Sequence, residues 1–197
     1  MSAENNFWQW FTENEEGLFN ADFEEELFDN LATRLQQVDP HLTFELGSKS
    51  SQRDFIISAG GIKSSFPAVE SLASSAPQLP RWNVIPFRPR RPLPCVLEIG
   101  GVKVSSEDVQ FSLLDNGKTA GVRLFIPGFQ EQDLNWKQIG YLLLDEALGE
   151  FDVESRLGLI KMYPPEASTQ EKRYPLSELP HAFDTLVSRL AEKNMAT

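Results

Sequence analysis

The sequence predicts an α+β fold in which an antiparallel β-sheet, built from consecutive hairpins, carries helices packed over one face. Two turn sequences, Gly100-Gly101 and Asn116-Gly117, each join segments in which apolar and polar residues alternate, as in tight hairpins. Residues 134–148 are apolar around most of a helical circumference, which is typical of a buried helix. The length of 197 residues suits one domain with a substantial core. We therefore expect a single α+β domain over residues 1–197.

We expect residues 1–40 to form an acidic helical segment, followed by the sheet and the central and C-terminal helices over residues 41–197. The first helix, which ends near Gly17, carries four large aromatic side chains: Phe7, Trp8, Trp10 and Phe11. These side chains either anchor a partner or pack into the protein's own core, and the large area that they would bury favours the core. A second helix over residues 22–38 has one apolar stripe and three glutamates in its first turn, where they complement the helix dipole.

The remaining elements follow from the period of the apolar residues. Alternation predicts strands over residues 42–46, 53–58, 82–87 and 157–162 and hairpins over residues 95–105 and 108–126. Apolar residues that recur every three or four positions predict helices over residues 66–75 and 177–193. Consecutive hairpins indicate an antiparallel sheet.

The helix at residues 134–148 is the element around which the rest is expected to pack. Two of its faces are apolar, one lined by Trp136, Ile139, Leu143 and Ala147 and the other by Tyr141, Leu144 and Leu148. Gly140 leaves a position without a side chain, where a neighbouring backbone can approach closely, and Gly149 suits the positive φ that ends helices. We expect its neighbours to enclose this helix.

The formal net charge is −11, and residues 1–43 supply most of it, with ten acidic residues and one basic residue. Nucleic-acid phosphates and anionic membranes repel such a chain, so we expect no nucleic-acid or membrane partner. The alternative to a binding role for this charge is that it only maintains solubility. No apolar run approaches the ~20 residues that span a bilayer, and the N-terminus lacks the pattern of a secretory signal. We expect a cytoplasmic protein.

A candidate ligand-binding group comprises Arg81, Trp82, Arg88, Arg90 and Arg91. Arginine binds phosphate or carboxylate through paired hydrogen bonds, tryptophan stacks on planar groups, and the intervening prolines hold the backbone extended. The group predicts either a site for a phosphate or an acidic peptide, or a loop whose arginines pair with the protein's own carboxylates. The surplus of acidic residues favours the second interpretation.

A candidate acidic cluster follows the central helix and comprises Glu150, Asp152 and Glu154. If residues 150–154 are extended, these carboxylates point the same way and could hold a hard cation or act as an acid–base pair. Structural ion pairs or solvated acids are the favoured interpretation, because the spacing of an EF-hand is absent. We expect no metal and no other cofactor.

No catalytic signature is present, and nothing in the sequence identifies a nucleophile. His41 and His181 are the only histidines, and Cys95, the only cysteine, lies in a predicted strand, where we expect a buried and inert thiol. A single cysteine excludes an intrachain disulfide.

Five segments extend over most of the chain: FWQWF (7–11), LTFELG (42–47), APQLPRW (76–82), PFRPR (86–90) and LLDEALGEFDVESRLG (143–158). In these segments the chain resembles an uncharacterised bacterial protein family. The resemblance implies a shared fold and a bacterial cytoplasmic setting, and it implies no site residues.

The acidic N-terminal segment, the many aromatic residues and the absence of a catalytic motif together indicate a non-enzymatic, protein-binding module. Its role would be regulatory or immunity-like, with acidic helices that mask a basic protein partner. The alternative is an enzyme acting on an anionic small molecule. Arg88, Arg90 or Arg91 would then hold the substrate, and Glu150 or Asp152 would act as a general base.

Overall fold

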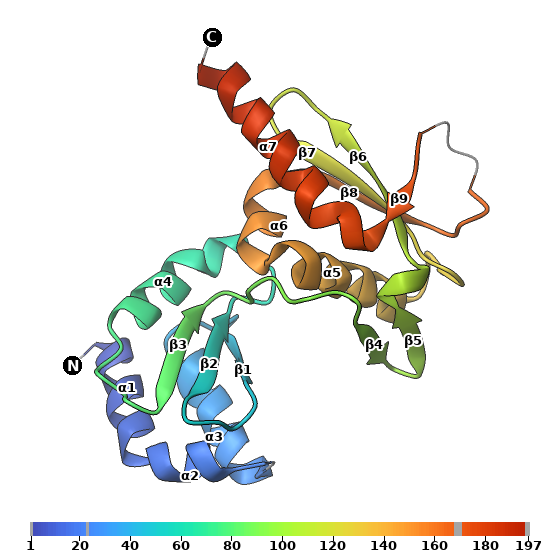
Figure 1. Ribbon diagram of the computed structural model, residues 1–197. Coiled ribbons are helices and arrows are strands. Elements are labelled where there is room, and N and C mark those ends of the chain that lie inside the picture. The colour runs from blue at the N-terminus through green and yellow to red at the C-terminus, as the bar shows by residue number, and fades with distance from the viewer. Residues whose placement is uncertain (1, 23, 168–170, 196–197) are drawn as a thin grey trace. The chain divides into compact units, whose positions relative to one another are not determined.

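The computed structural model describes residues 2–22, 24–167 and 171–195 and confirms the α+β class (Figure 1). The chain divides into two compact units, unit 1 over Met1–Arg88 and unit 2 over Pro89–Thr197. The helices of residues 1–40 therefore belong to the same unit as the first three strands. A single domain over residues 1–197 stays a prediction, and we describe each unit by itself.

Unit 1 packs helices against a three-stranded sheet (Figure 1). Its elements are α1 (Ala3–Glu13), α2 (Glu15–Asn20), α3 (Glu25–Gln36), β1 (Thr43–Leu46), β2 (Arg53–Ser58), α4 (Phe66–Ser74) and β3 (Trp82–Pro86). In the sheet order β1-β2-β3, β1 is antiparallel to β2, whereas β3 is parallel to it. The parallel pair follows from α4, because a helical connection returns the chain to the end of the sheet where the previous strand began.

The N-terminal aromatic residues form the core of unit 1, as the area they bury predicts. Phe7, Trp8 and Phe11 are buried, and Trp10 packs beside them. Phe55 of β2 lies among them, with its ring centroid 4.9 Å from that of Phe11. The indole Nε1 of Trp8 donates to the Leu72 carbonyl at 2.9 Å, so the polar atom of this buried ring is satisfied.

A buried arginine joins β2 to the end of α2. Arg53 is 6% exposed, and its Nη1 donates to the carbonyls of Leu18 and Ala21, each at 2.8 Å, and of Phe19 at 3.1 Å. Its Nε donates to the Gly47 carbonyl at 2.9 Å. The last carbonyls of a helix have no partner within the helix, and a cation at that end complements the helix dipole. Arg53 therefore satisfies polar groups that burial would otherwise leave unpaired.

Over its described residues, unit 2 contains a two-stranded sheet, a four-stranded sheet and three α-helices (Figure 1). Its elements are β4 (Val96–Ile99), β5 (Val102–Ser105), β6 (Gln110–Asp115), β7 (Ala120–Phe125), α5 (Leu134–Leu148), α6 (Glu150–Arg156), β8 (Leu157–Tyr163), β9 (Tyr174–Pro175) and α7 (Leu179–Met195). Both predicted hairpins are confirmed, as β4–β5 and β6–β7. Gly100 and Gly101 have φ of 56° and 81°, values that suit the tight turn.

The strands do not form one antiparallel sheet. The four-stranded sheet has the order β8-β7-β6-β9, and β8 pairs with β7 in parallel. Hairpin patterns in the sequence reveal only antiparallel neighbours, whereas α5 and α6 carry the chain from the end of β7 back to its beginning. The sheet pairing therefore combines both directions in units 1 and 2.

Helix α5 is central to unit 2, but its neighbours do not enclose it completely. Leu143 and Leu144, one from each predicted apolar face, have no exposed surface, which confirms burial at these two positions. Leu134 and Tyr141 are 75% and 45% exposed, respectively, so a stripe of the helix remains open. At Gly140 the close neighbour is the Met162 side chain of β8, which a Cβ atom would overlap.

We expect Arg53→Met to lower the free energy of unfolding of unit 1 by about 3 kcal/mol, because the carbonyls at the end of α2 lose their buried donor. Urea unfolding followed by tryptophan fluorescence measures this, since Trp8, Trp10 and Trp82 all lie in unit 1. Lys63→Met, at an exposed position, is the matched control and should change stability by less than about 0.5 kcal/mol. Equal unfolding midpoints for the two variants would contradict the role given to Arg53.

Candidate functional site

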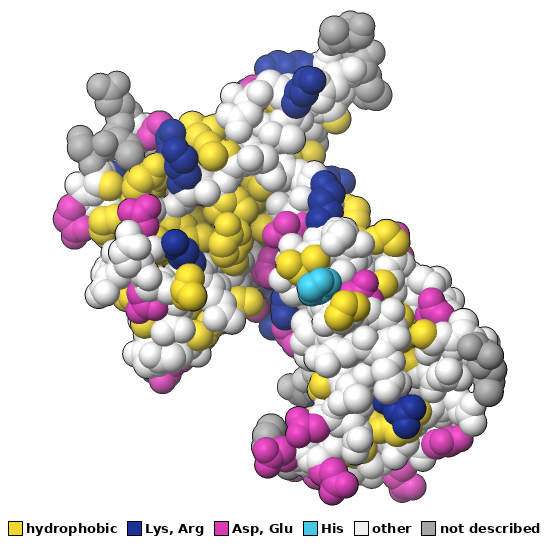
Figure 2. All heavy atoms as spheres, turned by 180° about the vertical axis from the view of Figure 1, so that it is seen from behind, with side chains coloured by type: hydrophobic (Ala, Val, Ile, Leu, Met, Phe, Trp, Pro, Cys, Tyr) yellow, Lys and Arg dark blue, Asp and Glu magenta, His cyan; other side chains and the backbone are white. Residues whose placement is uncertain are grey.

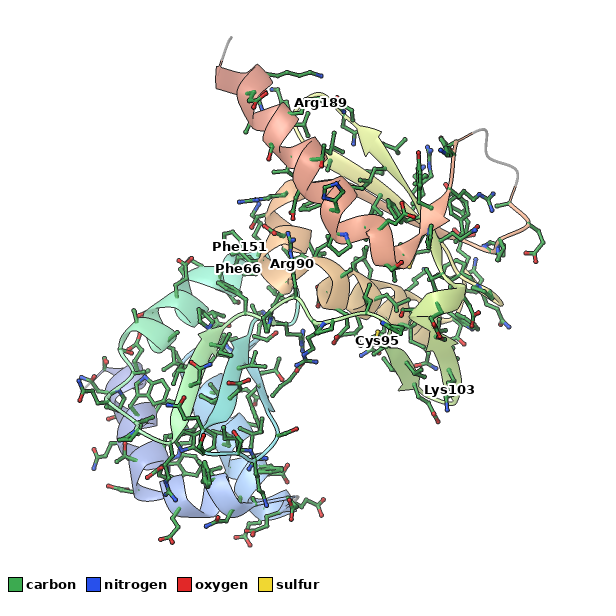
Figure 3. All side chains as sticks on the ribbon, viewed as in Figure 1. Phe66, Arg90, Cys95, Lys103, Phe151 and Arg189 are labelled. Carbon is green, nitrogen blue, oxygen red and sulfur yellow. The ribbon has the colours of Figure 1, made fainter. Side chains whose placement is uncertain are left out.

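The structure brings the arginine segment of unit 2 onto the acidic turn after α5. The Arg90 guanidinium binds three helices at once (Figure 3). Its Nε donates to the Leu148 carbonyl of α5 at 2.8 Å, and its Nη2 donates to Asp152 of α6 at 2.7 Å. Both terminal nitrogens donate to Asp184 of α7, at 2.9 and 2.8 Å, in the paired geometry that favours arginine over lysine.

Arg91 extends the same contact toward α5. Its backbone N–H donates to the Glu146 carbonyl at 2.8 Å, and its Nη1 lies 3.0 Å from the Glu146 carboxylate. Side chain and main chain of Arg91 therefore both hold the segment against one residue of the helix.

The expected display of three carboxylates on an extended segment is wrong. Gly149, with φ of 80°, ends α5, and residues 150–156 form the helix α6. Glu150 is completely buried, whereas Asp152 binds Arg90 and also lies 3.2 Å from Arg156 one turn later. In this helix Asp152 lies on a different side from Glu150 and Glu154, which are one turn apart, so the three carboxylates do not point the same way.

The contact perturbs the ionisation of its members. Hydrogen bonds with Asp184 raise the pKa of Arg90 above its usual value, and hydrogen bonds with Asp152 add to the effect against partial desolvation. Conversely, the hydrogen bond from Arg90 lowers the pKa of Asp184. Both shifts favour the charged forms, so the ion pair stays formed near neutral pH.

The other members of the candidate ligand-binding group lie in unit 1 and also bind residues of their own unit. Arg81 pairs with Glu15 at 3.0 Å and stacks on Phe19, 4.7 Å from its centroid. Trp82 is buried, and its Nε1 donates to Glu15. Arg88 forms an ion pair with Glu45 of β1. Trp82 is thus a core residue and not a free surface on which a planar ligand stacks.

The structure therefore joins Arg90 to Asp152 and Arg91 to Glu146, but it does not gather all five residues of the group. Sequence reasoning paired the arginines with the surplus carboxylates in general terms and missed the particular partners, above all Asp184. The spacing of apolar residues in α7 shows which side of the helix is buried. It does not indicate that Asp184, on the exposed side, binds an arginine 94 residues away in the sequence.

The remaining histidine, cysteine and carboxylate side chains give little indication of a metal or catalytic site. Among the described residues, no group of three or more His, Cys, Asp and Glu is placed to hold a metal ion. Cys95 lies just before β4 and is only partly buried, so the expectation of a buried thiol within a strand is wrong; partial burial raises its pKa. His41 and His181 are both exposed.

Two of the grooves in the described part of unit 2 are lined by strands of the four-stranded sheet and by one helix. The larger, of about 640 Å³, lies between the β6–β9 strands and α7 and is lined by residues that include Phe111, Leu113, Tyr174, His181, Leu186 and Arg189. The smaller, of about 310 Å³, lies between β8 and α5; we call it the edge groove, and its apolar lining is Phe129, Tyr141, Ile160, Met162 and Tyr163. Its charged lining residues are Glu131, Lys137 and Lys161.

Comparison of the chain with protein-family models, with curated proteins and with solved structures found no match. Within the described part of the chain, no helix combines the length and the apolar character needed to cross a bilayer.

We expect a double-mutant cycle of Arg90→Gln and Asp184→Asn to give a coupling free energy of about 1 kcal/mol, because the pair is bidentate but partly solvated. Thermal and urea unfolding followed by circular dichroism measure the four stabilities. The control cycle uses Glu98 and Lys103, which lie 3.8 Å apart on an exposed hairpin and should couple by about 0.3 kcal/mol or less. Indistinguishable coupling in the two cycles would show that the Arg90 pair has no structural role.

The lowered pKa of Asp184 predicts a pH dependence. A folded-state pKa below the ordinary value of about 3.9 stabilises the protein above that pH, and the stabilisation is lost as the pH falls through the lower folded-state value. Asp184→Asn should therefore show a smaller drop in urea midpoint between about pH 6 and pH 2.5 than the wild type. Arg90→Gln should reduce the drop in the same way, and an unchanged drop in both variants would contradict the assignment.

Proposed function

We propose that the protein is a non-enzymatic, protein-binding module with a regulatory or immunity-like role, whose acidic helices bind a basic surface of a partner protein. The supporting observation is an acidic face on unit 1, visible where Asp and Glu side chains gather at the end that carries α2 and α3 (Figure 2). Its exposed residues are Glu13, Glu16, Asp22, Glu24, Glu25, Glu26 and Asp29. We call this set the acidic face.

The basic residues near the acidic face do not balance it. Lys49 pairs with Asp22 at 2.6 Å, and Arg34 is directed to the Trp10 ring, 5.9 Å from its centroid. A surface with one sign of charge attracts oppositely charged partners over distances of about one Debye length and raises the association rate. Binding through this face would therefore be fast and sensitive to salt.

The arginine contacts favour a binding module over the alternative enzyme. An enzyme that held an anionic substrate with Arg88, Arg90 or Arg91 would first have to break their ion pairs with Glu45, Asp152, Asp184 or Glu146. Releasing a hydrogen-bonded carboxylate to admit an anion substitutes one negative group for another with little gain in free energy. The same arginines are well suited to fixing the positions of β1, α5, α6 and α7.

The test is affinity capture from a lysate of the source organism with the full chain as bait, at about 0.05 M and about 0.5 M salt. We expect the wild type to recover a basic protein at low salt and to release it at high salt. The triple variant Glu24→Gln, Glu25→Gln and Glu26→Gln should lose most of the recovery, because it removes three charges from the acidic face.

The matched control changes the same number of charges in unit 2, through Glu98→Gln, Glu107→Gln and Asp108→Asn, all at exposed positions. This control should recover the partner as the wild type does. Capture that is absent, insensitive to salt, or equally reduced in both triple variants would count against the proposal.

A further inference from the structure

Strand β8 is a terminal strand of its sheet. In the order β8-β7-β6-β9, its hydrogen-bonded neighbour in the described part of the chain is β7. β8 spans the seven residues Leu157–Tyr163, long enough to form a ladder with another strand. Proteins usually shield such an edge with a bulge, a proline or several charges. β8 has one shift in register, near its start, and a single charged side chain, Lys161.

The register shows which backbone groups of β8 point away from β7. The Ile126 N–H donates to the Tyr163 carbonyl at 2.9 Å, so Tyr163 directs its backbone groups toward β7. In a parallel pair the residues of one strand alternate in the side to which they direct N–H and C=O groups. Ile160 and Met162, which alternate with Tyr163, therefore direct theirs to the open side of β8.

The edge groove runs beside this open side and is apolar where β8 faces α5. Ile160 and Met162 line it from β8, and Tyr141 lines it from α5. Tyr141 is 45% exposed, which is unusual for a large side chain on the most buried helix of the unit. Backbone groups and an apolar groove thus adjoin.

The charge of the edge groove differs from that of the protein as a whole. Lys137 and Lys161 line it together with one acidic residue, Glu131, in a chain whose net charge is −11. The side chain of Lys161 alternates with those of Ile160 and Met162, so it leaves β8 toward the other face of the sheet and borders the edge groove at the strand edge. If a strand were added at this edge, one of its residues would lie beside Lys161. The residues before and after that one in the added strand would lie beside the groove.

We propose that the open edge of β8 binds an extended peptide in which apolar residues alternate with acidic residues. The peptide adds a fifth strand to the sheet through the outward backbone groups of Ile160 and Met162. Its apolar side chains enter the edge groove, and an acidic side chain pairs with Lys161 on the other face. Backbone hydrogen bonds supply affinity in this mode of recognition, and alternate side chains supply specificity.

A peptide fits the charges of this edge better than a second copy of the chain. Pairing of two β8 strands would bring Lys137 and Lys161 of one copy close to the same residues of the other, and like charges on neighbouring strands are destabilising. An acidic peptide is instead attracted to both lysines. This surface lies in unit 2 and takes an acidic partner, so the inference stands apart from the proposed function of the acidic face.

The test uses the full chain and fluorescent synthetic heptapeptides that alternate valine with glutamate or valine with lysine. Fluorescence anisotropy should show tighter binding of the Val/Glu peptide, by about fivefold or more. Methylation of alternate backbone nitrogens in this peptide should weaken binding by about tenfold or more, because the ladder cannot form.

Charge reversal provides the decisive comparison. Lys161→Glu should reverse the preference, so that the Val/Lys peptide becomes the tighter ligand, whereas Lys103→Glu on the exposed β4–β5 hairpin makes the same change in net charge and should keep the wild-type preference. Circular dichroism confirms that both variants fold. Tyr141→Ser should weaken binding of both peptides, because it removes apolar lining of the edge groove.

Three results would overturn the proposal. These are binding of neither peptide, an equal effect of Lys161→Glu and Lys103→Glu, and undiminished binding of the methylated peptide. Sedimentation tests whether a second copy of the chain occupies this edge instead. A dimer that is weakened by Lys161→Glu but is not dissociated by the Val/Glu peptide would assign the edge to a second copy.

Discussion

In each unit, an arginine that donates to the C-terminal carbonyls of a helix fixes the position of that helix. Arg53 binds the last carbonyls of α2 from β2, and Arg90 binds the Leu148 carbonyl at the end of α5 while it holds Asp152 and Asp184. The end of a helix carries unpaired carbonyls and partial negative charge, which a planar guanidinium with five donors can satisfy together. The packing of α2 in unit 1, and of α5, α6 and α7 in unit 2, depends on these contacts.

Because these arginines bind groups within their own unit, they affect the charge that remains on the surface. The chain has 29 acidic and 18 basic residues, and Arg53, Arg81, Arg88, Arg90 and Arg91 all bind groups of their own unit. The basic side chains that remain are too few to balance the carboxylates, so the acidic face of unit 1 is exposed. The proposed binding of a basic protein and the stabilising role of the arginines therefore have one origin in the distribution of charge.

The open edge of β8 follows from how the four-stranded sheet is built. The chain leaves β7, passes through α5 and α6 and returns parallel to β7, which places β8 last in the sheet and beside α5. The contact of Gly140 with Met162 brings α5 close to this strand, and Tyr141, the next residue, is then left beside the edge. The edge groove is thus a consequence of close helix–strand packing at one glycine.

The sequence by itself determined most elements of this protein, because their patterns are local. The period of apolar residues located the helices and strands, Gly100-Gly101 and Asn116-Gly117 located the hairpins, and the crowding of Phe7, Trp8 and Phe11 indicated a core. Only the tertiary structure decided the parallel pairs β2–β3 and β7–β8, the helical state of residues 150–156 and the pairing of Arg90 with Asp184. These features depend on contacts between residues far apart in the chain, and neither periodicity nor charge counts specify which distant groups meet.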